Sequence, residues 1–319
     1  MAGDRLDLPF TGIATFARVP HCPDIAELDA DVAIVGAPYD LGTQVRSGTR
    51  FGPRAIRNAS MIYALREISY YDAEFDRIFL EGVSVVDAGD VDMIHANPDL
   101  CLANVERTIR AVVERGAMPV TLGGDHAVPI PVVRALEDKG PLCVVQVDAH
   151  LDFVDERFGV REAHGNVMRR ISEMDHVSGL AQIGIRGPGS SDPSDFADAR
   201  RAGSVIIGPR EFRRVGIDEV LRRIPTASNY YVTMDCDGFD PALMPGNGSP
   251  SPGGFTYHEV VDLLRGVAEL GNVVGFDFVE VAPQYDPTEI TAQTAARVVL
   301  DFLGAIFEAR NGQTDTRQP

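Results

Sequence analysis

The chain is short of positive charge. It has 29 lysine and arginine residues against 47 aspartate and glutamate residues, and its formal net charge at pH 7 is −18. An acidic surface repels polyanions, so we expect neither nucleic acid nor an anionic membrane as a partner. The same charge gives weak support to a cationic small-molecule substrate.

Cysteine and long apolar runs are scarce as well. The four cysteines are far apart and match no zinc-binding spacing, and a disulfide framework is not expected in a chain of 319 residues. The N-terminal residues contain no basic region followed by an apolar stretch, and no apolar run reaches the length of a membrane span. We therefore expect no membrane association and a cytoplasmic location.

The apolar segments are instead short, and eight of them have the length and composition of buried strands. Most are apolar throughout rather than alternating, which is typical of a parallel sheet covered on both faces. Amphipathic helices are predicted between them, for example over 102–115 and 260–270. This alternation predicts a doubly wound α/β sheet in a single domain, residues 1–319, with a frayed tail from about residue 311. The predicted strands are 31–36, 83–87, 118–122, 142–147, 181–185, 204–207, 231–234 and 273–278.

Acidic and histidine residues gather where three of these strands end. Asp148, His150 and Asp152 occupy every second position after one strand, so their side chains point the same way. The same alternation aligns Asp235 and Asp237 after another strand, and it turns the cysteine between them away. Because ligands bind at the carboxyl ends of the strands in such sheets, we expect these motifs to converge on one edge.

Charge at the exit of a buried strand costs free energy unless something compensates it, and two divalent cations are the simplest compensation. Oxygen and imidazole ligands suit manganese and its neighbours better than thiolate-preferring metals, and nickel or another divalent ion stays possible. Such a dinuclear centre lowers the pKa of water and favours hydrolysis of a resistant planar carbon. Asp125 and Asp240, beside the motifs, are predicted either to orient ligands or to form turns. The six candidate ligands are His126, Asp148, His150, Asp152, Asp235 and Asp237.

Together with further segments at 36–40, 46–57 and 280–286, these motifs resemble the ureohydrolase superfamily, which includes arginase and agmatinase. The resemblance covers nearly the whole chain. It implies a three-layer α/β/α arginase-like fold with a largely parallel central sheet, and a centre of two Mn²⁺. It also implies a homo-oligomer, either a trimer or a hexamer, and an enzyme that cleaves a small guanidino compound to urea and an amine.

The resemblance also implies roles for individual residues. His126, Asp148, Asp152 and Asp235 would hold one metal or bridge both, and His150 and Asp237 would complete the second. Glu280 resembles the carboxylate that pairs with the planar guanidinium group. His164 resembles the histidine that passes protons to the leaving amine, and a pKa near neutrality suits that task. The catalytic candidates are thus His164, Glu280 and Asp152.

The tail of the substrate is less well specified by the sequence. The loop 153–163 differs from the hydroxyl-rich loop of arginases, so arginine is not expected. Three acids of the loop, Asp155, Glu156 and Glu162, would suit the distal ammonium of agmatine, and we take agmatinase activity as the leading hypothesis.

Other substrates and functions stay open. Arg157 or Arg161 would suit a guanidino acid such as 4-guanidinobutyrate or 3-guanidinopropionate, and the stretch 12–21 is similar to the guanidinobutyrase branch. Guanidine or a biguanide is a further possibility. Ala127 and the segment 246–250 depart from the common family pattern; neither change removes a ligand, but both leave the substrate pocket open. Two alternatives belong to other classes: a metal-dependent deacylase, which uses a single zinc ion, and a non-catalytic subunit of a hetero-oligomer, which would have lost ligands.

Overall fold

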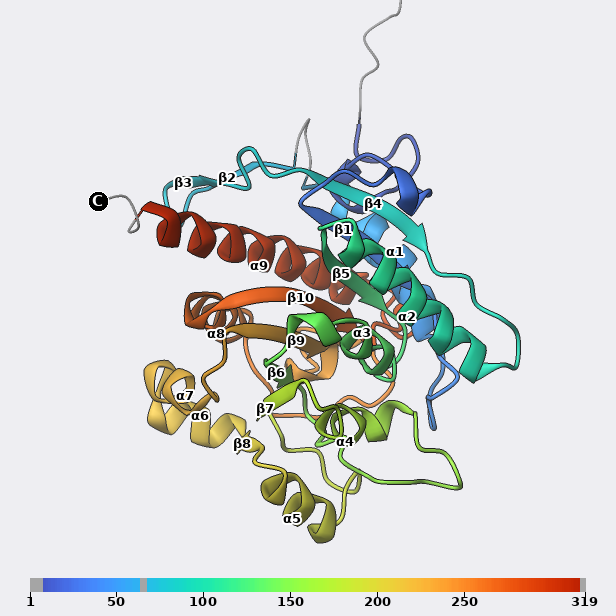
Figure 1. Cartoon of the computed structure of the whole chain (residues 1–319), viewed down its shortest axis with the longest axis vertical. Coiled ribbons are helices and arrows are strands. Elements are labelled where there is room, and N and C mark those ends of the chain that lie inside the picture. The colour runs from blue at the N-terminus through green and yellow to red at the C-terminus, as the bar shows by residue number, and fades with distance from the viewer. Residues whose placement is uncertain (1–7, 64–67, 316–319) are drawn as a thin grey trace, which may run out of the picture.

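The computed structural model of the chain describes residues 8–63 and 68–315. A central sheet of eight strands runs through it in the order β4-β1-β5-β10-β9-β6-β7-β8, and every pairing in this sheet is parallel (Figure 1). All eight predicted strands are confirmed with small shifts at their ends. They are β1 (Val32–Ala37), β4 (Val85–Asp90), β5 (Met118–Gly123), β6 (Leu142–Val147), β7 (Val177–Ile183), β8 (Val205–Ile207), β9 (Asn229–Asp235) and β10 (Asn272–Val279).

Helices cover both faces of the sheet, as Figure 1 shows, so the predicted three-layer α/β/α fold is confirmed. One face packs against α1 (Gly52–Ser60), α6 (Pro209–Val215), α7 (Ile217–Arg223), α8 (Tyr257–Leu270) and α9 (Ile290–Asp315). The other face packs against α2 (Pro98–Glu114), α3 (Pro129–Ala135), α4 (Val167–Ser172) and α5 (Pro193–Arg201). The helices predicted over 102–115 and 260–270 correspond to α2 and α8.

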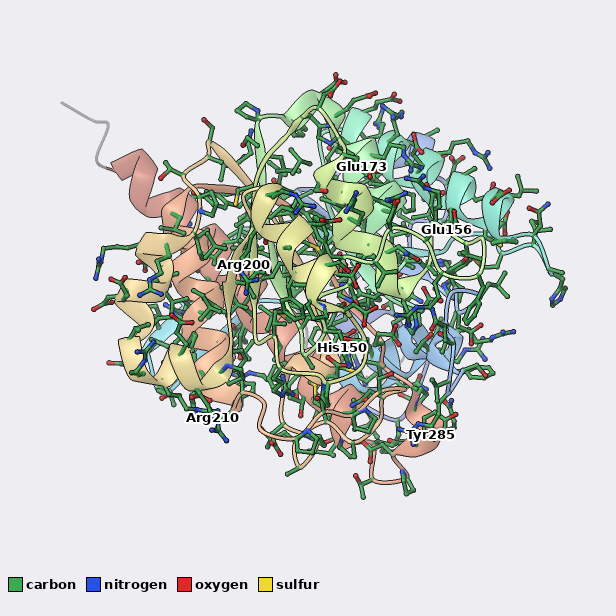
Figure 2. All side chains as sticks on the ribbon, turned by 90° about the horizontal axis from the view of Figure 1, so that it is seen from below. His150, Glu156, Glu173, Arg200, Arg210 and Tyr285 are labelled. Atoms are coloured by element: carbon green, nitrogen blue, oxygen red, sulfur yellow. The ribbon has the colours of Figure 1, made fainter. Side chains whose placement is uncertain are left out.

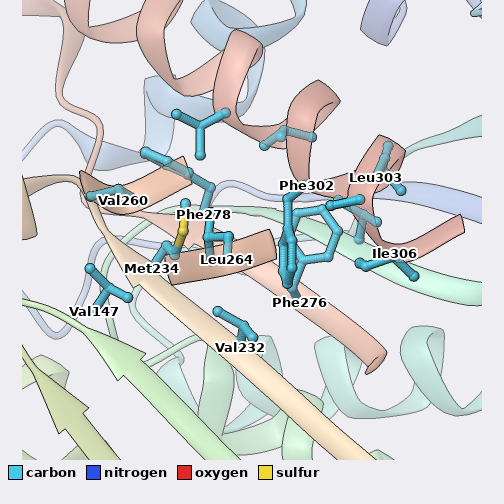
Figure 3. Close-up of a cluster of buried hydrophobic side chains, with 14 of the residues drawn as sticks. Val147, Val232, Met234, Val260, Leu264, Phe276, Phe278, Phe302, Leu303 and Ile306 are labelled. Atoms are coloured by element: carbon cyan, nitrogen blue, oxygen red, sulfur yellow. The ribbon is translucent and has the colours of Figure 1, made fainter. Parts of the chain in front are cut away.

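Strand alternation divides the apolar side chains between these two layers. Val145 points to the α8–α9 side and Val144 to the α2–α3 side, and both are fully buried. Figure 3 shows the first layer, in which Phe276 of β10 lies against Phe302 of α9 with ring centroids 4.8 Å apart. Because both faces are covered, the strands are apolar at most positions, and this made the strands recognisable in the sequence.

A hairpin and a long helix are among the elements that the sequence did not predict. A short antiparallel hairpin of β2 (Tyr70–Asp72) and β3 (Arg77–Phe79) lies outside the main sheet. The long helix α9 is, within the described ranges, the one helix that is long and apolar enough to cross a membrane by length and composition, contrary to the expectation of no such run. However, 72% of that stretch is buried inside the domain, as in a core helix. It continues to Asp315, so the tail expected from about residue 311 is helical up to that point, and residues 316–319 lie outside the described residues.

Short 3₁₀ helices complete the connections within the described ranges. The capping of α8 illustrates how local sequence fixes the boundaries: Thr256 accepts a hydrogen bond from the backbone of Glu259, whose side chain accepts one from the backbone of Thr256. The 3₁₀ helices are η1 (Phe16–Arg18), η2 (Ile25–Glu27), η3 (Thr49–Phe51), η4 (Glu137–Lys139), η5 (His164–Asn166), η6 (Cys236–Gly238) and η7 (Pro283–Tyr285).

Candidate metal centre

Three strands that are far apart in the sequence bring the predicted ligands to one edge of the sheet. His126 follows β5, the Asp148–Asp152 motif follows β6, and Asp235 is the last residue of β9. Since β5, β10, β9 and β6 are consecutive in the sheet, their carboxyl ends meet. All six predicted ligands lie at this edge. Figure 2 shows His150 near the middle of the view.

The six side chains form two adjoining groups. In the first, Nδ1 of His126 lies 2.9 Å from Oδ2 of Asp148 and 3.2 Å from Oδ2 of both Asp152 and Asp235. In the second, Nδ1 of His150 lies 2.9 Å from Oδ2 of Asp237 and 3.6 Å from Oδ1 of Asp148. Asp148 therefore offers one oxygen to each group, as a carboxylate shared by two cations would.

The first imidazole is held in the tautomer that a metal needs. Nε2 of His126 is 2.9 Å from Oγ1 of Thr233, and this hydroxyl in turn donates to Oδ1 of Asp277 at 2.8 Å. Because the hydroxyl proton is used on Asp277, Thr233 accepts from Nε2–H, which leaves a lone pair on Nδ1. That Nδ1 is buried and has no hydrogen-bond partner of adequate geometry, although three carboxylate oxygens surround it. An orphaned imidazole nitrogen among carboxylates fits a divalent cation.

The charges of the cluster also require compensation. Burial, together with repulsion from Asp152 and Asp237, raises the pKa of Asp148 to about 7, and burial raises the pKa of Asp235 well above its usual range. Burial opposes protonation of His150, but the neighbouring carboxylates outweigh it and raise the pKa of that imidazole to about 11. Without bound cations, these aspartates and His150 would therefore keep protons that they would otherwise have released at neutral pH.

The predicted catalytic pair lies beside the first group. Oε1 of Glu280 accepts a hydrogen bond of 3.0 Å from the backbone N–H of His126 and lies 3.3 Å from Nδ1 of His164. Burial works against a charged His164, yet the Glu280 carboxylate outweighs it and raises the pKa of His164 to about 9.

Two residues of the site have a strained backbone conformation. Glu280 and Asp152 both have positive φ, at 64° and 50°, a conformation that non-glycine residues seldom adopt. The N–H of Glu280 donates to the carbonyl of Gly124 at 2.9 Å, so a neighbouring strand end holds this residue in place. Such conformations persist only where the surroundings fix them, and they cluster at functional sites.

The acids with two predicted roles turn out to shape loops. Asp125 accepts hydrogen bonds from the backbone N–H groups of Gly42 and Ala127, and burial raises its pKa to about 7. Asp240 accepts from the backbone of Ala242 and Gly253, as a turn-forming aspartate does. Cys236 packs into the apolar core, as strand alternation predicted.

Sequence reasoning missed three residues that support the site. Thr233 and Asp277 hold the His126 ring. The sequence feature that could have indicated them is a polar residue inside a largely apolar strand, once in β9 and once in β10. Arg186 donates to backbone carbonyls on both sides of the site, at 2.7 Å to Asp237 and 2.6 Å to Ser251. It thereby ties the loop after β9 to the segment that forms one wall of the cavity above the ligands.

This cavity opens over the ligand cluster and has a volume of about 440 Å³. Its walls come from the loops around Gln44, Arg157, Ser190 and 249–252, and His164 and Glu280 line its floor with the ligands. A separate cavity of about 320 Å³ lies at the ends of β1 and β4 and contains none of the six ligands.

Comparisons with known proteins give matches over most of the chain. The model of the Arginase family matches residues 30–304. The guanidinobutyrase of Pseudomonas aeruginosa is 37% identical over 301 residues, 92% of both chains, and the mitochondrial agmatinase of Gallus gallus is 34% identical over 92% of this chain and 85% of its own. Among solved structures, the proclavaminate amidinohydrolase of Streptomyces clavuligerus superimposes with a TM-score of 0.85 at 32% identity, over 95% of this chain and 99% of its own.

Proposed function

The chain belongs to the arginase family, whose members are hydrolases of guanidino compounds, and from that premise we propose that its ligand cluster serves the cleavage of a linear guanidino compound to urea and an amine. One observation carries the proposal. Asp148 presents one carboxylate oxygen to each of two histidines, and each histidine faces at least one further carboxylate. A shared carboxylate between two imidazole–carboxylate groups is suited to two cations and has little use in a protein that binds none.

Manganese is the metal we propose for both positions. His126 and His150 supply imidazole nitrogen, and the four aspartates supply oxygen, a ligand set without thiolate. When bound, the two cations would lower the pKa of water so that hydroxide is available at neutral pH.

The chain's own side chains orient the substrate and move the proton. The Glu280 carboxylate, fixed by the backbone of His126, accepts N–H groups of the planar guanidinium and places its carbon over the cluster. Water adds to this carbon, and the bond from the carbon to the nitrogen of the substrate's tail breaks. His164, at 3.3 Å from Glu280, is placed to deliver the proton that the departing amine needs.

The test is urea release by the manganese-loaded protein from agmatine, 4-guanidinobutyrate, 3-guanidinopropionate, arginine, guanidine and metformin. We expect urea from at least one of them, and none after the metals are removed with a chelator. Urea from no compound, with two metals bound per chain, would overturn the proposal. Deacylation of acetyl-lysine peptides by a protein with a single zinc ion would support the deacylase alternative instead.

We further propose a homo-oligomer. Several large apolar side chains are solvent-exposed in the single chain, including Phe10 and Ile13, each 84% exposed. Contact between copies of the chain would remove such surface from water. Light scattering combined with size-exclusion chromatography gives the mass directly, and a monomer across the accessible concentration range would contradict the proposal.

A further inference from the structure

One loop at the mouth of the cavity ends in a tight hairpin. Arg157 and Val160 exchange backbone hydrogen bonds of 2.9 and 3.0 Å, and the two residues between them, Phe158 and Gly159, have φ of 56° and 81°. Positive φ at both central positions is the type I′ turn, which closes a two-residue hairpin. The hairpin fixes the backbone of Arg157 at its base, while Phe158 at the tip is 96% exposed.

The side chain of Arg157 lines the same cavity as His126 and His150. Its guanidinium group donates to Oε1 of Gln44 at 3.0 Å and to the carbonyl of Ser190 at 2.8 Å. Both acceptors are neutral, and within residues 8–63 and 68–315 no ion pair joins Arg157 to a carboxylate. These two contacts hold the guanidinium group between two loops. Because an arginine has five N–H donors, the group still has free donors and its full positive charge for a ligand.

The acids of the same loop are used elsewhere. Asp155 lies 2.5 Å from Nη2 of Arg170 and 3.1 Å from Nη2 of Arg161, and Glu162 lies 2.8 Å from Nη2 of Arg134. These ion pairs direct both carboxylates to other parts of the chain, and neither Asp155 nor Glu162 lines the cavity.

Glu156 is the third acid of the loop. It is exposed and does not line the cavity, and Figure 2 shows it well apart from His150. The acids on which the agmatine hypothesis depended are therefore not placed to meet a substrate.

Among the described residues that line the cavity, Arg157 is the one charged group that belongs neither to the ligand cluster nor to the Glu280–His164 pair. We propose that Arg157 binds a carboxylate at the far end of the substrate, so that the chain acts on ω-guanidino carboxylic acids. This inference rests on the proposed function, because it assumes that the guanidinium end of the substrate lies against Glu280.

The same arrangement disfavours cationic tails. The distal ammonium of agmatine, or the α-ammonium of arginine, would face the positive Arg157, and the remaining lining carboxylates are those of the metal centre and Glu280. A buried or half-buried charge without an opposite partner is costly. A guanidino acid without an α-amino group avoids this cost and gains a charge-assisted hydrogen bond to Arg157.

The experiment compares Arg157→Gln with Arg161→Gln, an arginine of the same loop that is exposed and already paired with Asp155. For the manganese-loaded proteins, kcat/KM is measured for 4-guanidinobutyrate, 3-guanidinopropionate and agmatine. We expect the wild type to prefer an acid, and Arg157→Gln to reduce the acid-to-agmatine ratio of kcat/KM by roughly 10- to 100-fold, as for a lost charge-assisted hydrogen bond. Arg161→Gln should leave the ratio as it is.

Binding provides a second measurement that needs no turnover. Isothermal titration of the metal-free proteins with 4-guanidinobutyrate should show weaker binding to Arg157→Gln than to Arg161→Gln, and Arg157→Glu should shift preference toward agmatine. Wild-type preference for agmatine, or an equal loss on acid and amine substrates in Arg157→Gln, would overturn the inference. No urea from any guanidino compound would instead overturn the proposed function, and the binding preference would still report on Arg157.

Discussion

Replacing Thr233 by valine removes the hydroxyl that links His126 to Asp277 and keeps the shape of the side chain. Two hydrogen bonds are lost, the contact of 2.9 Å from Nε2 of His126 and the donation of 2.8 Å to Asp277. His126 is only 1% exposed, so water cannot replace the acceptor. An unsatisfied buried donor and the loss of a hydrogen bond to a carboxylate together cost roughly 2–5 kcal/mol of the free energy of unfolding.

The same change should weaken metal binding. The ring of His126 would lose the partner that fixes its orientation and tautomer, and loss of such a partner typically reduces metal affinity 10- to 100-fold. We expect Thr233→Val to bind its first Mn²⁺ with this reduced affinity in a calorimetric titration. Its thermal unfolding should also occur at a lower temperature than that of the wild type.

Thr121 supplies a matched control. It lies on β5, paired with Asp277 from the opposite side to Thr233, and is equally buried, but its hydroxyl has no hydrogen-bond partner. Thr121→Val therefore removes an unsatisfied group and should be neutral or slightly stabilising. If the two valine variants have the same metal affinity and the same unfolding temperature, the link from Asp277 to His126 does not support the metal centre.

The remaining predictions concern the ligands and the proton carrier. Asp148→Ala removes the carboxylate shared by both groups, so the metal content measured by elemental analysis and the release of urea should both fall to background; retained turnover would contradict the two-metal centre. His164→Ala should slow urea formation by about 10²-fold or more while two metals stay bound, and loss of metal would identify His164 as a ligand instead. In the metal-free protein, burial raises the pKa values of Asp148 and Asp125 to about 7, so the folded state holds protons that the unfolded state releases near pH 4. Their stabilising contribution is complete below about pH 4 and is lost as the pH rises to about 7, so chemical denaturation should show a lower free energy of unfolding at pH 7.5 than at pH 5.5, with a smaller difference after Mn²⁺ is added.

The sequence predicted the sheet because its strands are buried on both faces. A run such as 142–147 has no polar face to confuse with a helix or a loop. The hairpin of β2 and β3 was missed because each strand has three residues and is largely exposed. The helix α9 was missed because apolar residues surround it on most sides, which removes the amphipathic period on which the helix predictions relied.

The site divides in the same way. Its ligands were predictable because they occupy alternate positions directly after strands, where local sequence decides both place and direction. The link between Thr233 and Asp277 depends on the register of two strands that are remote in sequence, and no local pattern contains that information. The charges of the loop 153–163 were visible, but their partners on other elements were not, so the sequence could not separate the exposed acids from the arginine that faces the cavity.

The order of strands in the sheet has a consequence for biosynthesis. The last two strands made, β9 and β10, lie in its middle, between β5 on one side and β6 on the other. A nascent chain that has emerged only as far as residue 228 holds two separate three-stranded pieces, β4-β1-β5 and β6-β7-β8, with His126 on one and Asp148 on the other. Because β9 and β10 must insert between these pieces to join them into one sheet, the metal centre is completed late, after the ribosome has synthesised most of the polypeptide. A chain that has acquired its metal ions is thus one whose sheet is already complete. Insertion of β9 and β10 is intrinsically slow, because it forms contacts between strands that are remote in sequence.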